Sequence, residues 1–315
     1  MGKIRVLAVV GPTASGKSEL AMALAERLNG EIVCMDSMQV YRRMDIGTAK
    51  PTAQERSRVR HHLLDVAEPT EAFAVADYAG LAAKAIEDIA SRGRLPVLAG
   101  GTGLYLSALA RGLTLGGVKG DEELRARYAA IAEEPGGRQR LHDLLAQADP
   151  DTAARLHPND LRRVVRALEV CELTGRPMSA QRGAETPGPY AVLALGLRMP
   201  RELLFQRVER RVRRMMELGL LDEVRSLLKS GVPPTAQSMQ GIGYKELVPA
   251  ALSGGQTSDA VRRIILNTRH YAKRQETWFR AEPAVRWLDA QSPGLPQAAE
   301  KAAAEFFSTA AKEAE

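Results

Sequence analysis

Residues 3–28 read KIRVLAVVGPTASGKSELAMALAERL, and this stretch decides the fold. It begins with a continuous apolar run that ends in glycine, which is typical of a buried parallel strand. Leu20, Leu24 and Leu28 then recur at helical spacing until Asn29 and Gly30 end the pattern. A strand that runs through a glycine-rich turn into a helix is the first unit of an α/β fold.

The turn itself, GPTASGKS at residues 11–18, matches the pattern G-x-x-x-x-G-K-[ST] in full. Such a loop wraps a phosphate group with backbone N–H donors at a helix N-terminus. Lys17 is expected to neutralise phosphate oxygens and the Ser18 hydroxyl to reach a Mg²⁺ ion. The alternative is a chance glycine-rich turn. The predicted phosphate-binding residues are Gly11, Pro12, Thr13, Ala14, Ser15, Gly16, Lys17 and Ser18.

The rest of the chain repeats the strand and helix pattern with one interruption. Apolar runs predict strands at 31–34, 95–101 and 190–199, and helical spacing predicts helices at 77–92, 201–217, 220–230 and 258–279. We therefore expect an α/β fold with a P-loop NTPase-like parallel sheet flanked by helices. Between the sheet segments the sequence is helical, charged and broken by Pro and Gly. The predicted parts are a first core segment 1–118, a helical insertion 119–189 and a second core segment 190–315. The Ala/Lys/Glu-rich tail from Gln297 is expected to be a frayed surface helix.

Composition limits the class of protein. The 45% of hydrophobic residues is ample for a packed interior. The apolar run at the N-terminus is too short for a signal peptide or a membrane span, so we expect a cytoplasmic protein with no membrane contact. We also expect a monomer. Cys34 and Cys171 lie far apart without a metal-ligand pattern, which argues against zinc and disulfides.

The formal charge of +6 is concentrated in the last third, where residues 262–280 hold six Lys/Arg and one Glu. That excess indicates an anionic partner.

Two further strand ends carry polar side chains. The segment CMDSMQVYR brings Asp36, Ser37 and Gln39 to the end of the second predicted strand, and AGGTGLYL brings Thr102 to the end of another. The carboxyl ends of parallel strands are where such folds bind ligands. Asp36 can hold a magnesium water or accept a proton from a nucleophile. The alternative is that Asp36 caps a turn or helix.

Basic residues recur at helical spacing near the C-terminus. Arg207 and Arg211 lie four apart and are expected to clamp a diphosphate, whereas Arg210, Arg213 and Arg214 are expected to be solvated charges paired with Glu. On the next long helix a basic stripe predicts contact with an RNA or DNA backbone, and the insertion adds three arginines. The stripe is Arg262, Arg269, Lys273 and Arg280, and the insertion arginines are Arg162, Arg163 and Arg166.

Taken together, several motifs resemble one family. GPTASGKS, DSMQVYR, IGTAKPT, AGGTGLYL, HPND..R..RALEV..LTGRP.S, MQGIGYKE and TRHYAKRQ.TWFR resemble, in order and over about residues 11 to 280, the bacterial tRNA dimethylallyltransferases, also called tRNA isopentenyltransferases. The resemblance implies transfer of a prenyl group from dimethylallyl diphosphate to the exocyclic amine of the adenine 3′ to the anticodon, in tRNAs that read codons beginning with U. The phosphate loop would then hold a leaving group.

The resemblance also implies residue roles. The expected catalytic residues are Asp36, Thr102, Lys17 and Arg211, with Asp36 as the proton acceptor and Mg²⁺ at Ser18. The diphosphate of the donor is expected to bind the phosphate loop, Arg207 and Arg211. The expected partner is the anticodon stem-loop of tRNA. Its predicted contacts are Asp36, Ser37, Met38, Gln39, Thr102, Arg162, Arg163, Val164, Val165, Arg166, Gln240, Gly241, Ile242, Gly243, Tyr244, Lys245, Arg269, Lys273 and Arg280.

Three alternatives remain open from the residues alone. A P-loop small-molecule or nucleotide kinase shares the loop and the sheet but has no need for the C-terminal basic stripe. A prenyltransferase acting on free AMP or ATP lacks much of this C-terminal region. A nucleotide-gated RNA-binding module would bind tRNA without consuming the donor.

The chain also departs from the family pattern at Leu161-Arg162, where Pro-Gln often precedes the arginine of the insertion, so the base contact of that glutamine is not carried over.

Overall fold

The computed structural model describes residues 3–111, 120–181 and 188–313. The chain separates into two compact units, one of residues Met1–Ala110 with Pro189–Glu315 and the other of residues Arg111–Gly188. The sequence placed the insertion at 119–189, and the second unit begins eight residues earlier, near the end of a helix that follows the sheet.

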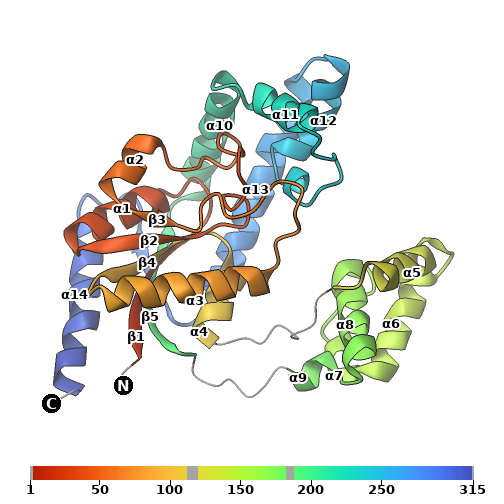
Figure 1. The fold of residues 1–315 in the computed structure, drawn as a ribbon, viewed down its shortest axis with the longest axis horizontal. Helices are drawn as coiled ribbons and strands as arrows, with labels where there is room; N and C mark the ends of the chain where they lie inside the picture. Colours follow the sequence, from red (N-terminus) through yellow and green to blue (C-terminus); the bar gives the residue numbers. More distant parts are fainter. Residues whose placement is uncertain (1–2, 112–119, 182–187, 314–315) are drawn as a thin grey trace. The chain divides into compact units, whose positions relative to one another are not determined.

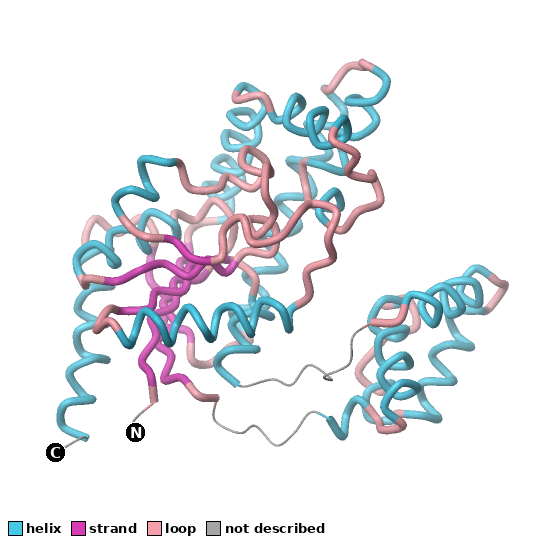
Figure 2. The backbone as a smooth tube through the Cα atoms, viewed as in Figure 1, coloured by secondary structure: helices cyan, strands magenta, loops and turns pink. Residues whose placement is uncertain are grey.

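A single six-stranded parallel sheet forms the centre of the larger unit (Figures 1 and 2). Its strand order is β3-β2-β4-β1-β5-β6, and every pairing is parallel. The parallel α/β sheet predicted from the sequence is thus confirmed. The strands are β1 (Ile4–Val10), β2 (Gly30–Met35), β3 (His61–His62), β4 (Leu95–Gly100), β5 (Tyr190–Arg198) and β6 (Val285–Asp289).

Helices cover both faces of this sheet because its central strands are apolar on both sides. Leu7 and Val9 of β1 point to the layer that contains α1 and α14, whereas Val6, Ala8 and Val10 point to the layer built from the other long helices. The helices and the one 3₁₀ turn of this unit are α1 (Lys17–Arg27), α2 (Ala53–Arg58), α3 (Val75–Ser91), α4 (Gly103–Arg111), α10 (Arg201–Glu217), α11 (Leu220–Lys229), η1 (Ser238–Gln240), α12 (Tyr244–Ser253), α13 (Ser258–Arg280) and α14 (Leu295–Glu313).

The topology brings the functional candidates to one edge. Strands β1, β2 and β4 are neighbours and run in the same direction, so their carboxyl ends meet at one edge of the sheet. The phosphate loop, Asp36 and Thr102 follow these three ends directly. Their convergence is therefore a consequence of strand order.

The smaller unit is entirely helical in its described residues. Its helices pack around a core of its own that contains Leu141, Leu145, Val164 and Ala167, all fully buried. Such a core allows a unit of this size to hold its shape. The helices are α5 (Glu122–Glu133), α6 (Gly137–Ala148), α7 (Pro150–Ala153), α8 (Leu161–Thr174) and α9 (Met178–Gln181).

The prediction for the C-terminal tail was partly wrong. Helix α14 is not a free surface helix, because Ala299, Ala302 and Ala303 are buried against α1 and the sheet. These alanines lie three and four residues apart and so form one face that allows close approach. No helix in the described part of the chain is both long enough and apolar enough to cross a membrane.

Candidate active site

The phosphate loop has the backbone conformation that its glycines allow. Gly16 adopts a φ of 94° immediately before α1, a left-handed conformation that favours glycine. The Ser15 amide donates to the Pro12 carbonyl at 3.3 Å, and Lys17 Nζ reaches back to the same carbonyl at 3.2 Å. The loop is thus curled over the N-terminus of α1, where backbone N–H groups and the helix dipole favour an anion.

A cavity of about 720 Å³ opens over this loop. The predicted clamp residues on α10 reach it: Arg207 Nη1 lies 3.8 Å from the point where a Cβ on Gly16 would be, and Arg211 lines the same cavity. The lining residues are Ala14, Gly16, Lys17, Ser18, Glu19, Met22, Ala23, Glu55, Arg58, Arg207 and Arg211. The structure therefore brings together three of the cations that the sequence assigned to diphosphate, although they are almost 200 residues apart.

Two adjacent cations in this cavity, Lys17 and Arg211, have lowered pKa values. Burial, followed by the nearby Arg211 guanidinium, lowers the pKa of Lys17 to about 8. Burial likewise lowers the pKa of Arg211, and Asp36 is the acid that opposes the shift at both cations. Lowered pKa values at two adjacent cations mean that each is destabilised in its charged form, and an anionic ligand would relieve this cost.

Asp36 uses one carboxylate oxygen to hold its own loop. Oδ1 accepts the amides of Met38 at 2.8 Å and of Gln39 at 3.4 Å. Within the described residues no donor is hydrogen-bonded to Oδ2. The turn-capping alternative is therefore correct for one oxygen, while the other remains available for chemistry.

Thr102 and Tyr271 lie beside this carboxylate. The Thr102 amide donates to the Met35 carbonyl at 3.3 Å, which ties the end of β4 to the end of β2. Burial raises the pKa of Tyr271 and the Asp36 charge raises it further, while interaction with the Thr102 hydroxyl acts in the opposite direction. Asp36, Thr102 and Tyr271 thus share one polar site next to Lys17 and Arg211.

The sequence did not predict Gln275, which joins two of the glycine-rich loops. Its Oε1 accepts the Thr13 amide at 2.8 Å, and its Nε2 donates to the Gly101 carbonyl at 2.9 Å. A Cβ on Gly101 would lie 2.0 Å from that Nε2, so a larger residue there would displace the Gln275 side chain. The sequence carried one signal for this role, a polar amide on the apolar face of α13. A buried amide requires hydrogen-bond partners, so its position there indicates a polar contact.

Of the residues predicted to contact the base, Gln39 already has all its side-chain groups engaged. Its Oε1 accepts from Cys34 Sγ at 3.1 Å, and its Nε2 donates to the carbonyls of Thr48 at 3.0 Å and Ala49 at 3.2 Å. Gln39 therefore braces the loop in this structure, and Ser37 and Met38 beside it are only partly exposed.

Several cations of the two basic helices form ion pairs, and some of these paired side chains are also exposed. Arg213 pairs with Glu209 at 2.7 Å and Arg214 with Glu217 at 3.2 Å, as predicted. Arg269 also pairs with Glu209, at 3.2 Å, so it joins α13 to α10. Arg262 and Arg280 pair with Asp259 and Glu276 on the same helix, and their side chains are exposed, as is that of Lys273.

In the smaller unit the predicted arginine run is split. Arg162 and Arg163 are exposed on α8, and Arg163 pairs with Asp160 at 3.4 Å. Arg166 instead pairs with the fully buried carboxylate of Glu169. Val164 is fully buried in the core of this unit, so its side chain is excluded as an RNA contact. The helical period explains this division, because the five consecutive positions 162–166 cannot all face outward.

The predicted tRNA-binding segment 240–245 is likewise divided between exposed and buried residues. Gln240 and Lys245 are exposed, whereas Gly241, Gly243 and Tyr244 are buried and Ile242 is half-buried. Tyr244 is 1% exposed and donates its hydroxyl to Glu223 at 2.6 Å. The ring is therefore inside the protein, and the predicted tRNA contact of Tyr244 stays a prediction for its backbone.

Comparisons with known proteins relate this chain to one family. The model of the IPP transferase family matches residues 39–282. The tRNA dimethylallyltransferase of Geobacter metallireducens is 50% identical over 91% of this chain and 93% of its own, and that of Halalkalibacterium halodurans is 47% identical over 91% of each.

Solved structures are similar over the same length. The tRNA isopentenylpyrophosphate transferase of Bacillus halodurans superimposes with a TM-score of 0.74 at 42% identity, covering 99% of this chain and 100% of that one. A eukaryotic dimethylallyltransferase acting on tRNA gives a TM-score of 0.77 at 32% identity, over 91% of this chain and 74% of that one. The family match, the identity and the shared fold together show that the chain belongs to the IPP transferase family.

Proposed function

We propose that this chain is a tRNA dimethylallyltransferase, which moves the prenyl group of dimethylallyl diphosphate to the exocyclic N6 amine of the adenosine 3′ to the anticodon, in tRNAs that read codons beginning with U. The observation that carries this proposal is one site with two chemically different halves. One half is an anion cavity over the phosphate loop, and the other is a carboxylate with a free oxygen next to it. Relatives about 50% identical bear the same name.

In this reaction the amine lone pair forms a bond to C1 of the prenyl group as the C1–O bond breaks. The diphosphate leaves with the electron pair of the C1–O bond. Lys17, Arg207, Arg211 and the loop amides would stabilise the charge that develops on the leaving oxygens. The same groups would bind the donor before the bond breaks.

Asp36 would accept the proton that the amine loses. An exocyclic adenine amine is a weak nucleophile because its lone pair is delocalised into the ring, and its proton becomes acidic only as the new C–N bond forms. A carboxylate with one oxygen held by backbone amides and the other free is suited to that role, because its orientation is fixed in advance. Thr102 would hold the amine or the bridging oxygen from the neighbouring strand end.

Magnesium fits the donor set. Mg²⁺ prefers oxygen ligands and is bound in such enzymes by one or two protein groups together with substrate phosphates. Ser18 supplies a hydroxyl at the rim of the cavity, and the described residues contain no cluster of three or more His, Cys, Asp or Glu that would form a separate metal site. When bound, Mg²⁺ would neutralise part of the diphosphate charge.

The tRNA would be held by the exposed cations. The candidates are Arg162 and Arg163 of the smaller unit and Lys273 and Arg280 of α13, each exposed in its own unit. Phosphate contacts of this kind would offset the few kcal/mol needed to extrude the target adenine from the anticodon loop. Salt should therefore weaken tRNA binding.

Mass spectrometry of tRNA nucleosides tests the proposal. After incubation with dimethylallyl diphosphate and Mg²⁺, an adenosine should gain one C5H8 unit, and fragmentation of the anticodon stem-loop should locate it 3′ to the anticodon. Release of ADP from ATP with a small acceptor would instead indicate a kinase. Binding of tRNA with the donor unconsumed would indicate a binding module.

A further inference from the structure

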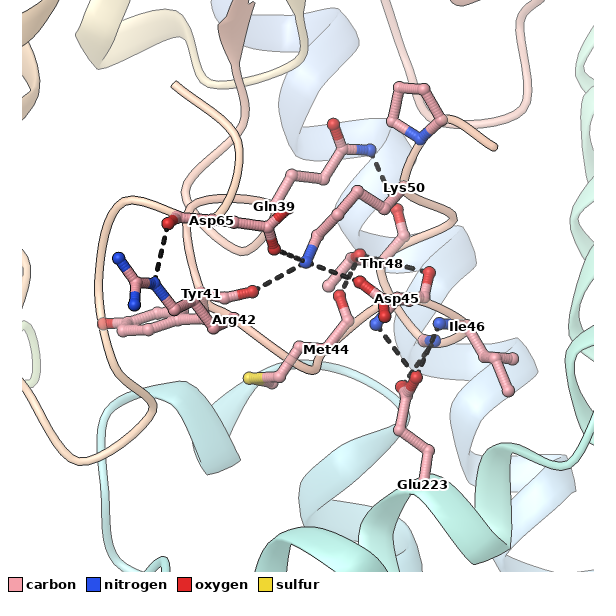
Figure 3. Close-up of polar contacts among 12 residues, drawn as sticks. Gln39, Tyr41, Arg42, Met44, Asp45, Ile46, Thr48, Lys50, Asp65 and Glu223 are labelled. Carbon is pink, nitrogen blue, oxygen red and sulfur yellow. Dashed lines mark hydrogen bonds and ion pairs between the residues drawn. The ribbon is translucent and has the colours of Figure 1, made fainter. Parts of the chain in front are cut away.

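The segment that follows Asp36 is long and irregular, yet it is held by two dense sets of polar contacts. Residues 36–50, here called the acid loop, connect the end of β2 to the turn before α2 and contain turns without regular helix or strand. A loop of this length needs its own stabilising contacts to keep one conformation. Figure 3 shows the two sets, one centred on Lys50 and the other on Glu223.

The first set closes the acid loop on itself. The Lys50 side chain is 1% exposed, and its ammonium contacts Asp45 Oδ1 at 2.7 Å, Asp65 Oδ1 at 2.6 Å and the Tyr41 carbonyl at 2.7 Å. Three acceptors satisfy the three N–H donors of a lysine. A buried charge that is fully paired in this way fixes the conformation of the segment around it.

The second set ties the acid loop to the C-terminal helices. On α11, Glu223 Oε2 accepts the amides of Asp45 at 2.9 Å and Ile46 at 2.8 Å, and Oε1 accepts the Gly47 amide at 3.1 Å. Oε1 also accepts the Tyr244 hydroxyl at 2.6 Å. One carboxylate thus receives four donors from two separate parts of the chain, and hydrogen bonds to a charged acceptor are the strong ones.

The side chains at this junction are closely packed against the two glycines. A Cβ on Gly47 would lie 2.6 Å from the Tyr244 ring, and a Cβ on Gly241 would lie 2.5 Å from Met38 Cε. The IGTAKPT and QGIGYKE motifs are therefore two sides of one contact. Glu246 extends it to α13, because it accepts the Gly243 amide at 2.7 Å and the Asn267 side-chain amide at 2.8 Å.

A continuous chain of contacts leads from this junction to the Asp36 carboxylate. Glu223 fixes the backbone at 45–47, the next carbonyls at Thr48 and Ala49 accept from the Gln39 side chain, and the Gln39 backbone amide donates to Asp36 Oδ1. Every link is a described hydrogen bond or a covalent connection within the chain. Loss of the first link would therefore reach the carboxylate through the loop.

We propose that Glu223 is a positioning residue: it clamps the amides of residues 45–47 so that the acid loop holds Asp36 in the orientation needed to take the proton from the amine. This inference rests on the proposed prenyl transfer for its kinetic readout but not for its structural one. Glu223 does not line the donor cavity, so its action on the reaction is indirect.

The test compares Glu223→Gln with Asp222→Asn. The first substitution keeps the size of the side chain but removes the charge that four donors share. Asp222 is the matched control, because it is the neighbouring residue, is 77% exposed and, among the described residues, forms an ion pair only with Arg225 on the same helix. We expect kcat for prenyl transfer to fall roughly ten- to a hundredfold in Glu223→Gln, while the KM for dimethylallyl diphosphate stays within about twofold and Asp222→Asn behaves as wild type.

A double variant separates positioning from general damage. If Glu223 acts through Asp36, Glu223→Gln should cause no further loss of kcat in an Asp36→Asn background, because the group that it orients is already disabled. Tyr244→Phe keeps the ring on Gly47 and removes one donor, and it should lower kcat by a smaller factor. Multiplicative losses in the double variant, or normal kcat in Glu223→Gln, would overturn the proposal.

Hydrogen exchange provides the readout that does not need activity. Peptides covering residues 43–50 should exchange faster in Glu223→Gln than in Asp222→Asn, while peptides covering β1 should be unchanged. Unchanged exchange at 43–50 would refute the clamp whatever the kinetics. If wild type failed to prenylate tRNA, the proposed function would fall, and the exchange comparison would still decide whether Glu223 holds the acid loop.

Discussion

The lowered pKa of Lys17 makes the affinity for the donor depend on pH in a defined window. The pKa of about 8 in the free protein places the loss of the Lys17 charge between about pH 7 and pH 9. A bound diphosphate would raise this pKa again, because it puts negative charge next to the ammonium. Affinity should therefore be greatest below pH 8 and fall as pH rises through the pKa of the free form.

The magnitude follows from the protonated fraction. With a pKa of about 8, Lys17 is about 90% protonated at pH 7 and about 10% at pH 9, so the Kd for the donor should rise roughly tenfold between these values. The diphosphate of dimethylallyl diphosphate is largely ionised across this range, since phosphate groups have a second pKa near 6. The titration should therefore report the protein.

Isothermal titration of dimethylallyl diphosphate at half-unit steps from pH 6.5 to 9.5 measures this dependence. The control is Lys17→Met, which should bind weakly and with no break near pH 8. A Kd for wild type that is flat across the window would refute the reasoning, as would an equal dependence in Lys17→Met.

Three other changes test separate parts of the account. Asp36→Asn should lower kcat by about 10²–10⁴ while leaving the donor Kd within about twofold, measured by single-turnover prenyl transfer and by titration. Gln275→Leu removes the bridge between Thr13 and Gly101 and leaves the buried Gly101 carbonyl and the part-buried Thr13 amide unpaired, so the free energy of unfolding should fall by about 2–4 kcal/mol in urea titrations. Glu31→Gln should cost about 2–3 kcal/mol at pH 7, because the carboxylate is 1% exposed and pairs with Arg92, which is 34% exposed, and Arg94, which is 40% exposed. Each of these has an outcome that contradicts it. Normal turnover in Asp36→Asn would remove the proton-acceptor role of that carboxylate, and unchanged stability in Gln275→Leu would mean that the loops hold without the bridge. For Glu31 the test is the direction in which its contribution to the free energy of unfolding changes with pH. Hydrogen bonds from Arg92 first, and then from His62 and Arg94, hold the pKa of Glu31 well below its ordinary value, so its contribution is present above about pH 4.5 and lost as pH falls below that. A stability difference between wild type and Glu31→Gln that persists undiminished as the carboxylate becomes protonated in acid would be inconsistent with this.

The central strands and long helices could be predicted because their signals are local. An apolar run that ends in glycine, followed by leucines at helical spacing, specifies β1 and α1 without reference to the rest of the chain. The edge strands β3 and β6 were missed. Strand β3 has only two residues, and β6 pairs with β5 alone, so neither carries a long apolar run.

The site was predictable to the extent that one motif contains it. The phosphate loop is contiguous, and the positions of Asp36 and Thr102 follow from their places after parallel strands. The bridge from Gln275 to Thr13 spans 262 residues, and no local pattern encodes it. Gln39, Val164 and Tyr244 were assigned outward roles from their motifs, but side-chain direction depends on packing partners that only the folded chain defines.

The central claim is that the phosphate loop holds a departing diphosphate while Asp36 takes a proton from an amine. The most direct measurement is the stoichiometry of products in one reaction with dimethylallyl diphosphate and an anticodon stem-loop. We predict one diphosphate released for each prenylated adenosine formed, in wild type at a normal rate and in Asp36→Asn slowly but in the same ratio. Orthophosphate or a phosphorylated acceptor in place of intact diphosphate, or diphosphate without prenylated RNA, would contradict the account.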